Sequence, residues 1–351
     1  MQQKGEKGSF SAIRARLSLA RIGGGLAGLA AALFLFAGAS AKAAPPRPGR
    51  VAAASGAIPF VFVPIEDGNR IVELDSAGKV IWQTAVRDPD DVSVTPQGDL
   101  LVNEPDRASV VLISRETGKE IWRYGHDGRP GSGPGFLRLP DDAFRLADGS
   151  TLICDSGNHR IIRVGEKGRI LWQYGHTGKR GSAPGFLEAP NDAVPLANGD
   201  ILITTEYPAR ILEVSPAHAV VWSIEAARFG AESPPVRELS DAVPTAVPDR
   251  YLVAVYQKPG RILELDHSGR VDWSYGPKGG PGALDRPSAV MALADGRIVI
   301  SDDGHDRVVM VDRAGHLLWS FGNRKSTPGV SDVKPVAPWP IVLGKKAPAK
   351  D

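Results

Sequence analysis

The sequence has few of the residues on which common catalytic and metal sites depend. It contains one cysteine, Cys154, so an internal disulfide and a cysteine-rich zinc site are excluded. It has no G-x-S-x-G nucleophile elbow, no H-E-x-x-H zinc motif and no G-x-x-x-x-G-K-[ST] phosphate loop. These absences remove the most easily recognised classes of enzyme.

The chain also lacks a strong net charge. Its formal charge is +2 over 351 residues, with 42 basic and 40 acidic side chains. Residues 1–43 carry six basic residues and one acidic residue, so the other 36 basic and 39 acidic residues give the body a charge of −3. A nucleic-acid-binding protein needs an excess of Lys and Arg to neutralise phosphates, and we therefore expect no nucleic-acid partner.

The N-terminal segment, residues 1–43, has the pattern of an export signal. Five basic residues precede an uncharged run from Ile22 to Ala41, and small residues of the A-x-A type close that run. The run is 20 residues long, which is also enough for an uncleaved membrane anchor. Both interpretations place the body outside the cytoplasm, in the periplasm or secreted, with the membrane contacted only through this segment.

Tryptophan marks a repeat along the rest of the chain. Six of the seven tryptophans lie 40, 50, 50, 51 and 46 residues apart, at positions 82, 122, 172, 222, 273 and 319. Turn sequences of the Asp-Gly and Gly-Asn type divide each unit into four short strands. Units of four antiparallel strands with a period of about 50 residues are typical of β-propeller blades.

The length fits an all-β fold, a six-bladed β-propeller of four-stranded antiparallel blades. Six blades need about 300 residues, and residues 44–351 number 308. The first unit lacks an innermost strand, and residues 332–337 align with 192–197 of a complete unit. We therefore expect a C-terminal strand to complete the first blade and close the ring. The stretch 340–343 leaves open an incomplete seventh blade.

The expected organisation follows from these segments. It comprises a signal peptide or N-terminal membrane anchor (1–43), a linker (44–58), the β-propeller (59–343) and a disordered tail (344–351).

Two sequence elements resemble known propeller repeats. Residues 155–161 (DSGNHRI) and 134–140 (PGFLRLP) resemble the NHL repeat, and residues 117–122 (TGKEIW) are similar to the tryptophan-bearing repeat of PQQ-like propellers. The resemblance implies the fold but no single activity, because such propellers include scaffolds, lyases, arylsulfotransferase-like proteins and quinoprotein dehydrogenases. Quinoprotein dehydrogenases are expected to have eight blades and often adjacent cysteines, so we expect no bound PQQ here.

Carboxylates recur at the expected start of the innermost strand. They are Asp91, Asp142, Asp192, Asp241 and Asp332, with Ala289 at the sixth position. Carboxylates about 10 Å apart would repel by roughly 1.7 kcal/mol at an effective dielectric of 20. Hydrogen bonds from loop amides would relieve the repulsion, and so would a bound cation such as Ca²⁺. We expect the amide bonds and no resident cofactor, and we keep these residues as candidates for binding a ligand or cation.

Four histidines are expected on the same face as these carboxylates: His126, His159, His176 and His305. Imidazoles gathered there could bind zinc or transfer protons. No H-x-x-x-H spacing occurs, so we expect no metal, and the four remain ligand or catalytic candidates. An arginine opens the third strand of five units, and we expect these arginines to pair with acids such as Asp155 and Asp302.

Because each recurrent residue has a structural role, the sequence favours a non-enzymatic, exported and monomeric module. It would bind an unidentified protein or small ligand on the loop-rich face. The alternative is an extracytoplasmic lyase or transferase, arylsulfotransferase-like or NHL-lyase-like, with its site at the mouth of the central channel. The first catalytic candidates for that alternative are His159, Asp142 and Asp192.

Overall fold

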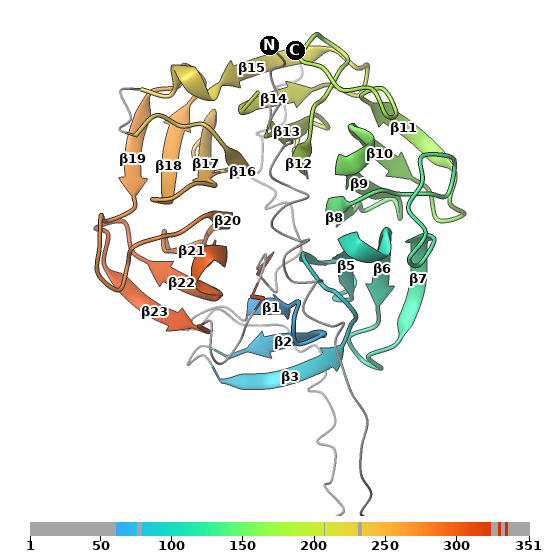
Figure 1. The fold of residues 1–351 in the computed structure, drawn as a ribbon, viewed down its shortest axis with the longest axis horizontal. Coiled ribbons are helices and arrows are strands. Elements are labelled where there is room, and N and C mark those ends of the chain that lie inside the picture. Colours follow the sequence, from blue (N-terminus) through green and yellow to red (C-terminus); the bar gives the residue numbers. More distant parts are fainter. Residues whose placement is uncertain are drawn as a thin grey trace, which may run out of the picture. The chain divides into compact units, whose positions relative to one another are not determined.

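Six four-stranded antiparallel sheets surround a common centre in the computed structural model (Figure 1). The structure describes residues 61–75, 79–206, 208–230, 234–323, 329–330 and 334–335. The predicted all-β, six-bladed propeller is confirmed. The expected signal or anchor, linker and tail lie outside the described residues, as do Asp332 and the stretch 340–343. Among the described residues, no helix is both long and apolar enough to span a membrane.

The first three blades take up the N-terminal half of the propeller. Blade 1 contains β1 (Val61–Ile65), β2 (Arg70–Leu74) and β3 (Val80–Ala85). Blade 2 contains β4 (Val92–Val94), β5 (Leu100–Glu104), β6 (Ser109–Ile113) and β7 (Glu120–Gly125). Blade 3 contains β8 (Pro140–Arg145), β9 (Thr151–Asp155), β10 (Arg160–Val164) and β11 (Ile170–Tyr174).

The other three blades repeat this order from the centre outward. Blade 4 contains β12 (Pro190–Pro195), β13 (Ile201–Thr205), β14 (Arg210–Val214) and β15 (Val220–Glu225). Blade 5 contains β16 (Leu239–Pro244), β17 (Arg250–Val255), β18 (Arg261–Asp266) and β19 (Val271–Tyr275). Blade 6 contains β20 (Pro287–Ala292), β21 (Ile298–Asp302), β22 (Arg307–Val311) and β23 (Leu317–Phe321).

A short C-terminal strand closes the ring. β24 (Lys334–Pro335) lies antiparallel to β1, with Pro335 opposite Val61 and Lys334 opposite Phe62. Blade 1 therefore has the strand order β24-β1-β2-β3 and takes its innermost strand from the other end of the chain. This confirms the predicted closure, which covers a sheet edge that would otherwise be open for pairing with another chain.

The tryptophan period reflects contacts between neighbouring blades. On four outer strands the indole N–H donates to a carbonyl in the next blade: Trp122 to Glu166 (3.2 Å), Trp172 to Pro216 (3.0 Å), Trp222 to His267 (3.0 Å) and Trp273 to Arg313 (2.8 Å). The ring supplies a large apolar surface while its N–H fixes the neighbour's turn. These four contacts between successive blades explain why tryptophan recurs at a regular spacing.

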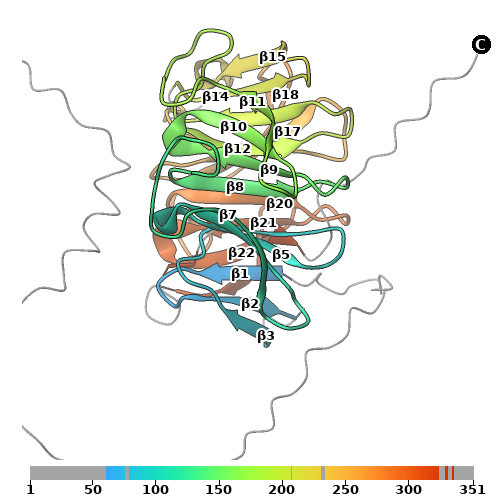
Figure 2. The ribbon, with the colours of Figure 1, turned by 90° about the vertical axis from the view of Figure 1, so that its right-hand side faces the viewer.

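The alternating strands divide the loops between two faces, and Figure 2 shows loops projecting from both sides of the sheets. The long connectors between blades share one face with the loops that join second to third strands. Three of those loops contain short 3₁₀ helices: η2 (Pro105–Arg107), η3 (Ser156–Asn158) and η5 (Asp303–His305). A fourth, η4 (Ala226–Arg228), lies in the connector from blade 4 to blade 5. We call this side the loop-rich face.

Candidate functional site

Four of the recurrent carboxylates lie buried at the start of innermost strands. Asp91, Asp142, Asp192 and Asp241 are 1, 5, 4 and 3% exposed. In blades 3, 4 and 5 the strand pairing shifts register at this point, so Asp142, Asp192 and Asp241 each lie within a β-bulge. A bulge turns a side chain away from the regular pleat, which allows these carboxylates to face the neighbouring blade.

The carboxylates bond to backbone amides of the innermost strands. Asp241 Oδ2 accepts the N–H of Val290 in blade 6 at 2.8 Å. Asp142 Oδ2 accepts the N–H of Ala193 in blade 4 at 3.4 Å, and Asp192 Oδ1 accepts the same N–H at 2.8 Å. The amides belong to innermost strands, whereas the sequence suggested loop amides. Two of these carboxylates therefore join the inner strand of one blade to that of the next.

Cys154 lies between the carboxylates of blades 3 and 4. Its thiol is fully buried and donates a hydrogen bond to the carbonyl of Pro190, with Sγ 3.1 Å from the oxygen. Burial raises the pKa of this thiol well above its usual value, and the carboxylates of Asp141, Asp142 and Asp192 raise it further. A thiol kept protonated in this way is a poor nucleophile, so Cys154 has a packing role.

His159 lies against a connector. Its backbone has a positive φ of 57° at the end of η3, and its Nδ1 accepts the N–H of Ala189 at 3.3 Å. Burial lowers the pKa of His159, and the charged groups that act on it are Glu188 and Arg180.

The other histidine candidates fall into two settings. His126 and His176 are exposed on successive connectors, and their rings lie 4.2 Å from those of Phe136 and Phe186. His305 ends η5, and its Nδ1 lies 2.8 Å from Asp302 Oδ2. His305 also lines an open hollow of about 430 Å³ at the edge of blade 6.

Two of the repeated arginines, Arg160 and Arg307, pair with acids as predicted, whereas Arg210 donates to the carbonyls of Ser182 and Phe186. Arg160 Nε lies 2.7 Å from Asp155 Oδ2, and Arg307 Nε lies 2.7 Å from Asp302 Oδ2. Burial raises the pKa of Asp155, and the amide of Arg138 and the charge of Arg160 oppose that shift. Arg160 and Arg307 therefore each balance a buried carboxylate beside the loop-rich face.

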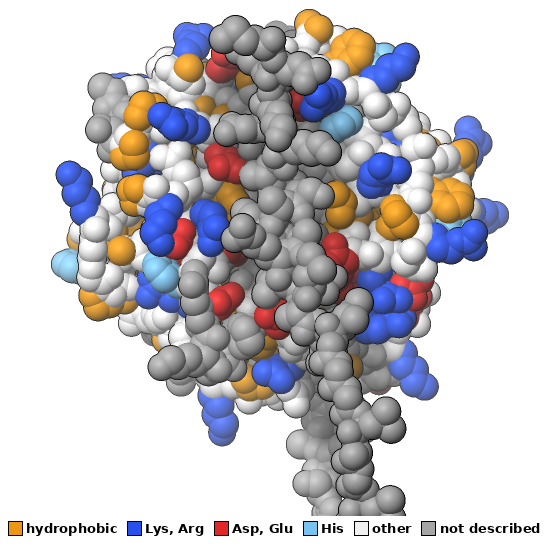
Figure 3. Space-filling view, viewed as in Figure 1, with side chains coloured by type: hydrophobic (Ala, Val, Ile, Leu, Met, Phe, Trp, Pro, Cys, Tyr) orange, Lys and Arg blue, Asp and Glu red, His pale blue; other side chains and the backbone are white. Residues whose placement is uncertain are grey.

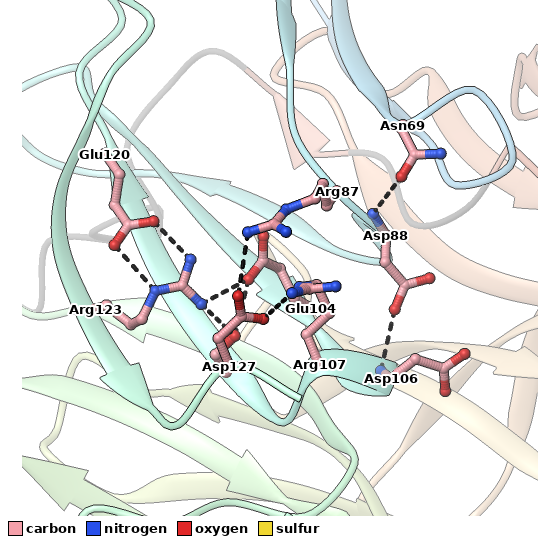
Figure 4. Close-up of polar contacts among 10 residues, drawn as sticks. Asn69, Arg87, Asp88, Glu104, Asp106, Arg107, Glu120, Arg123 and Asp127 are labelled. Atoms are coloured by element: carbon pink, nitrogen blue, oxygen red, sulfur yellow. Dashed lines mark hydrogen bonds and ion pairs between the residues drawn. The ribbon is translucent and has the colours of Figure 1, made fainter. Parts of the chain in front are cut away.

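A polar network between blades 1 and 2 was not foreseen from the sequence (Figure 4). Asp127 accepts hydrogen bonds from Arg87, at 3.1 Å, and from Arg107. The bond from Arg107 lowers the pKa of Asp127. Arg123 joins the network through Glu104 at 2.9 Å. Glu104 ends its strand as Asp155 and Asp302 do in other blades, but the bonds of Asp127 join loops from two blades, so no periodic signal could have revealed them.

One group of carboxylates in the described part of the chain could share a cation. Oxygens of Glu66, Asp88 and Asp106 lie within 4.8 Å of one another. The backbone N–H of Asp106 also donates to Asp88 Oδ2 at 3.1 Å, and Figure 4 shows both residues at the junction of blades 1 and 2. This group could not be predicted from the sequence, because its members come from three separate loops.

Charge is unevenly spread over the face shown in Figure 3. Lys and Arg side chains lie mostly toward the rim, and several Asp and Glu side chains lie closer to the centre.

The family follows from two overlapping matches. Residues 38–218 and 157–335 match the family described as outer membrane protein assembly factor BamB, whose members carry PQQ-like repeats, and together they cover residues 38–335. The chain belongs to this family. The family match bears out the resemblance to PQQ-like propellers, and the resemblance to NHL repeats stays a prediction. No curated protein sequence matches this BamB-like chain.

Solved structures share the propeller fold. A protein of unknown function from Bacteroides caccae has a TM-score of 0.59 and 17% identity, covering 79% of this chain and 98% of its own. A chain of a nidogen/laminin complex has a TM-score of 0.54 and 14% identity, with 78% and 97% covered. A catalytically inactive virginiamycin B lyase from Staphylococcus aureus with quinupristin has a TM-score of 0.52 and 12% identity, with 80% and 89% covered. At these identities the likeness shows the fold alone.

Proposed function

We propose that this BamB-like propeller is an exported scaffold that binds a partner protein through its loop-rich face. The observation that carries the proposal is the fixation of the connectors on that face. Arg160 and Arg210 donate from Nη2 to the carbonyls of Phe136 and Phe186, at 3.3 and 3.0 Å. Loops held in one conformation lose little conformational entropy when a partner binds, which favours recognition of another protein.

The roles of the recurrent residues support the same proposal. The carboxylates of Asp142 and Asp241 join neighbouring blades, and Arg160 balances Asp155. These residues hold the scaffold together, and the loops that differ between blades remain for recognition. The description of the family as an assembly factor is consistent with a partner protein. The proposal includes export through segment 1–43, a monomeric propeller, and binding without nucleic acid or a resident cofactor.

An extracytoplasmic lyase or transferase is the second candidate function. The observation that favours it is His305, whose imidazole is held by the fully buried carboxylate of Asp302 beside an open hollow. An oriented imidazole next to a cavity is a common arrangement for general acid–base catalysis. This candidate puts the chemistry at blade 6, away from the channel mouth that the sequence suggested.

Purification of the tagged, full-length chain from its native cells, with mild in-cell cross-linking, tests the leading proposal. We expect one partner protein in a constant ratio, recovered from the extracytoplasmic fraction. Light scattering should give a complex heavier than the 37.2 kDa chain by the mass of that partner. Recovery of the chain alone at its monomer mass, in the cytoplasmic fraction, would contradict the proposal.

A further inference from the structure

Three connectors between blades follow one plan. In each, an arginine of the third strand donates from Nη2 to the carbonyl of the residue before a leucine: Arg160 to Phe136 (3.3 Å), Arg210 to Phe186 (3.0 Å) and Arg307 to Ala283 (2.7 Å). These bonds make Phe136, Phe186 and Ala283 equivalent positions. In blades 3 and 4 the phenylalanine ring packs on a histidine of its own connector, with centroids 4.2 Å apart.

The connector into blade 6 is shorter and lacks this ring. Thirteen positions separate Tyr124 from Leu137, but nine separate Tyr275 from Leu284, so the blade 6 connector has four residues fewer. Beside Ala283 an open hollow of about 430 Å³ remains. We call it the blade 6 hollow. Its lining includes Gly280, Pro281, Ala283, His305, Arg307 and Ser320.

The outer strand also contributes less bulk to this corner of blade 6. In blade 3, the residue after Trp172 is Gln173, whose Oε1 lies 3.4 Å from Arg160 Nη1. The residue after Trp319 is Ser320, which lines the hollow. Serine is smaller than glutamine. Blade 6 therefore has space at Ser320 that the side chain of Gln173 fills in blade 3.

His305 takes the place of Asn158 at the buried aspartate. Asn158 Nδ2 lies 2.8 Å from Asp155 Oδ2 and also donates to the connector carbonyl of Gly131 at 2.8 Å. His305 Nδ1 makes the corresponding contact with its own buried aspartate at 2.8 Å. Within the described ranges, no bond joins His305 to the blade 6 connector, so its ring is held at one edge and faces the hollow with the other.

We propose that the blade 6 hollow binds an aromatic side chain from a loop of the partner protein. That ring would replace the phenylalanine which blades 3 and 4 supply from their own connectors. The inference rests on the proposed function and names the docking site for it. Pro281 and Ala283 offer apolar contacts, and the fixed imidazole of His305 offers a ring to pack against, as His126 and His176 do. Aromatic anchors in preformed pockets are frequent centres of binding energy between proteins.

A peptide copied from this chain provides the probe. Acetyl-Gly-Pro-Gly-Phe-Leu-amide has the sequence of residues 133–137, which includes Phe136. We would titrate it into protein labelled with ¹³C in the rings of its seven histidines, with His305→Asn to assign the signal. We expect the His305 resonance to move with peptide concentration. A control peptide with alanine in place of phenylalanine should bind at least tenfold more weakly.

Two variants fill the hollow from within the chain. Ala283→Phe restores the missing ring, and Ser320→Gln introduces the amide side chain that blade 3 has at Gln173. Each change should weaken binding of the probe peptide at least tenfold. Ser274→Gln is the matched control, because Ser274 follows Trp273 at the same exposed position of blade 5 and should leave binding unchanged. An unmoved His305 signal at millimolar peptide, equal binding of the alanine peptide, or unchanged binding in both filled variants would overturn the inference.

The same experiment separates this inference from the proposed function. One outcome is that the peptide fails to bind while a partner protein is still cross-linked to other positions of the loop-rich face. That result overturns the inference and leaves the proposed function standing. Probe binding in a protein that forms no cross-link to any partner supports the hollow as a site for aromatic groups and overturns the proposed function.

Discussion

Replacement of Arg160 by methionine should destabilise the propeller strongly. The side chains of Arg160 and Asp155 are 3 and 0% exposed, and their closest atoms are 2.7 Å apart. Methionine preserves much of the length of the side chain but leaves the carboxylate of Asp155 buried. Among the described residues, its remaining hydrogen-bond donors are the amide of Arg138 and Asn158 Nδ2. Removing one partner of a buried ion pair costs about 3–5 kcal/mol.

Two other blades supply graded controls. Arg307→Met should cost less, about 2–3 kcal/mol, because the Arg307 side chain is 15% exposed, against 3% for Arg160, so solvent already screens that ion pair in part. Arg210→Met should cost least, about 1–2 kcal/mol. Among the described residues, Arg210 donates only to the carbonyls of Ser182 and Phe186, so its removal leaves no carboxylate unbalanced. Urea unfolding at pH 7, followed by tryptophan fluorescence, gives the three losses.

Acidification should reduce the loss of stability caused by Arg160→Met. Burial already raises the pKa of Asp155, and loss of the Arg160 charge raises it further. The unfolded value is about 3.9, so the penalty is full above the raised folded pKa and shrinks as Asp155 gains a proton. The loss should therefore be smaller at pH 5 than at pH 7. Equal losses for the three arginines, or a loss that grows on acidification, would refute this reasoning.

Three further predictions concern the candidate site and the closure. Asp142→Asn and Asp192→Asn should each cost about 1 kcal/mol, because asparagine keeps an acceptor for the Ala193 amide; a Ca²⁺-dependent rise in Tm that both variants abolish would disprove this. Burial lowers the pKa of His159 below its unfolded value of about 6.5, so its contribution to stability is present above pH 6.5 and is lost as the pH falls. His159→Asn, which tolerates positive φ, should lose less stability than the wild type between pH 7.5 and 5.5 in urea titrations, and parallel slopes would count against the assignment. Deletion of residues 328–351 removes β24 and should lower Tm in calorimetry, whereas an unchanged Tm would contradict closure by that strand.

The fold could be predicted because its cause is periodic. One indole per blade contacts the next blade, so the spacing of residues such as Trp122 and Trp172 reveals the unit, and Asp-Gly turns mark its strands. The pairs Asp155–Arg160 and Asp302–Arg307 could also be anticipated, since each pair is local in sequence and joins two adjacent strands of one blade.

The rest of the site depends on features that do not repeat. Asp127 binds Arg87 because two blades happen to place these loops together, and no spacing rule encodes that contact. The blade 6 hollow arises from a shorter connector, and its length is visible in the sequence. Its consequence is not visible, because only the three-dimensional equivalence of Phe136 and Ala283 shows which ring is missing.

A cross-linking map in native cells tests partner binding on the loop-rich face most directly. A photoreactive amino acid would replace Arg129 or Arg180 on the exposed connectors, and Asn198 or Glu116 in the exposed turns of the opposite face. The account predicts one discrete adduct with the same partner protein from the connector positions and none from the opposite turns. Adducts of equal yield from both faces, or only from the opposite turns, would contradict it.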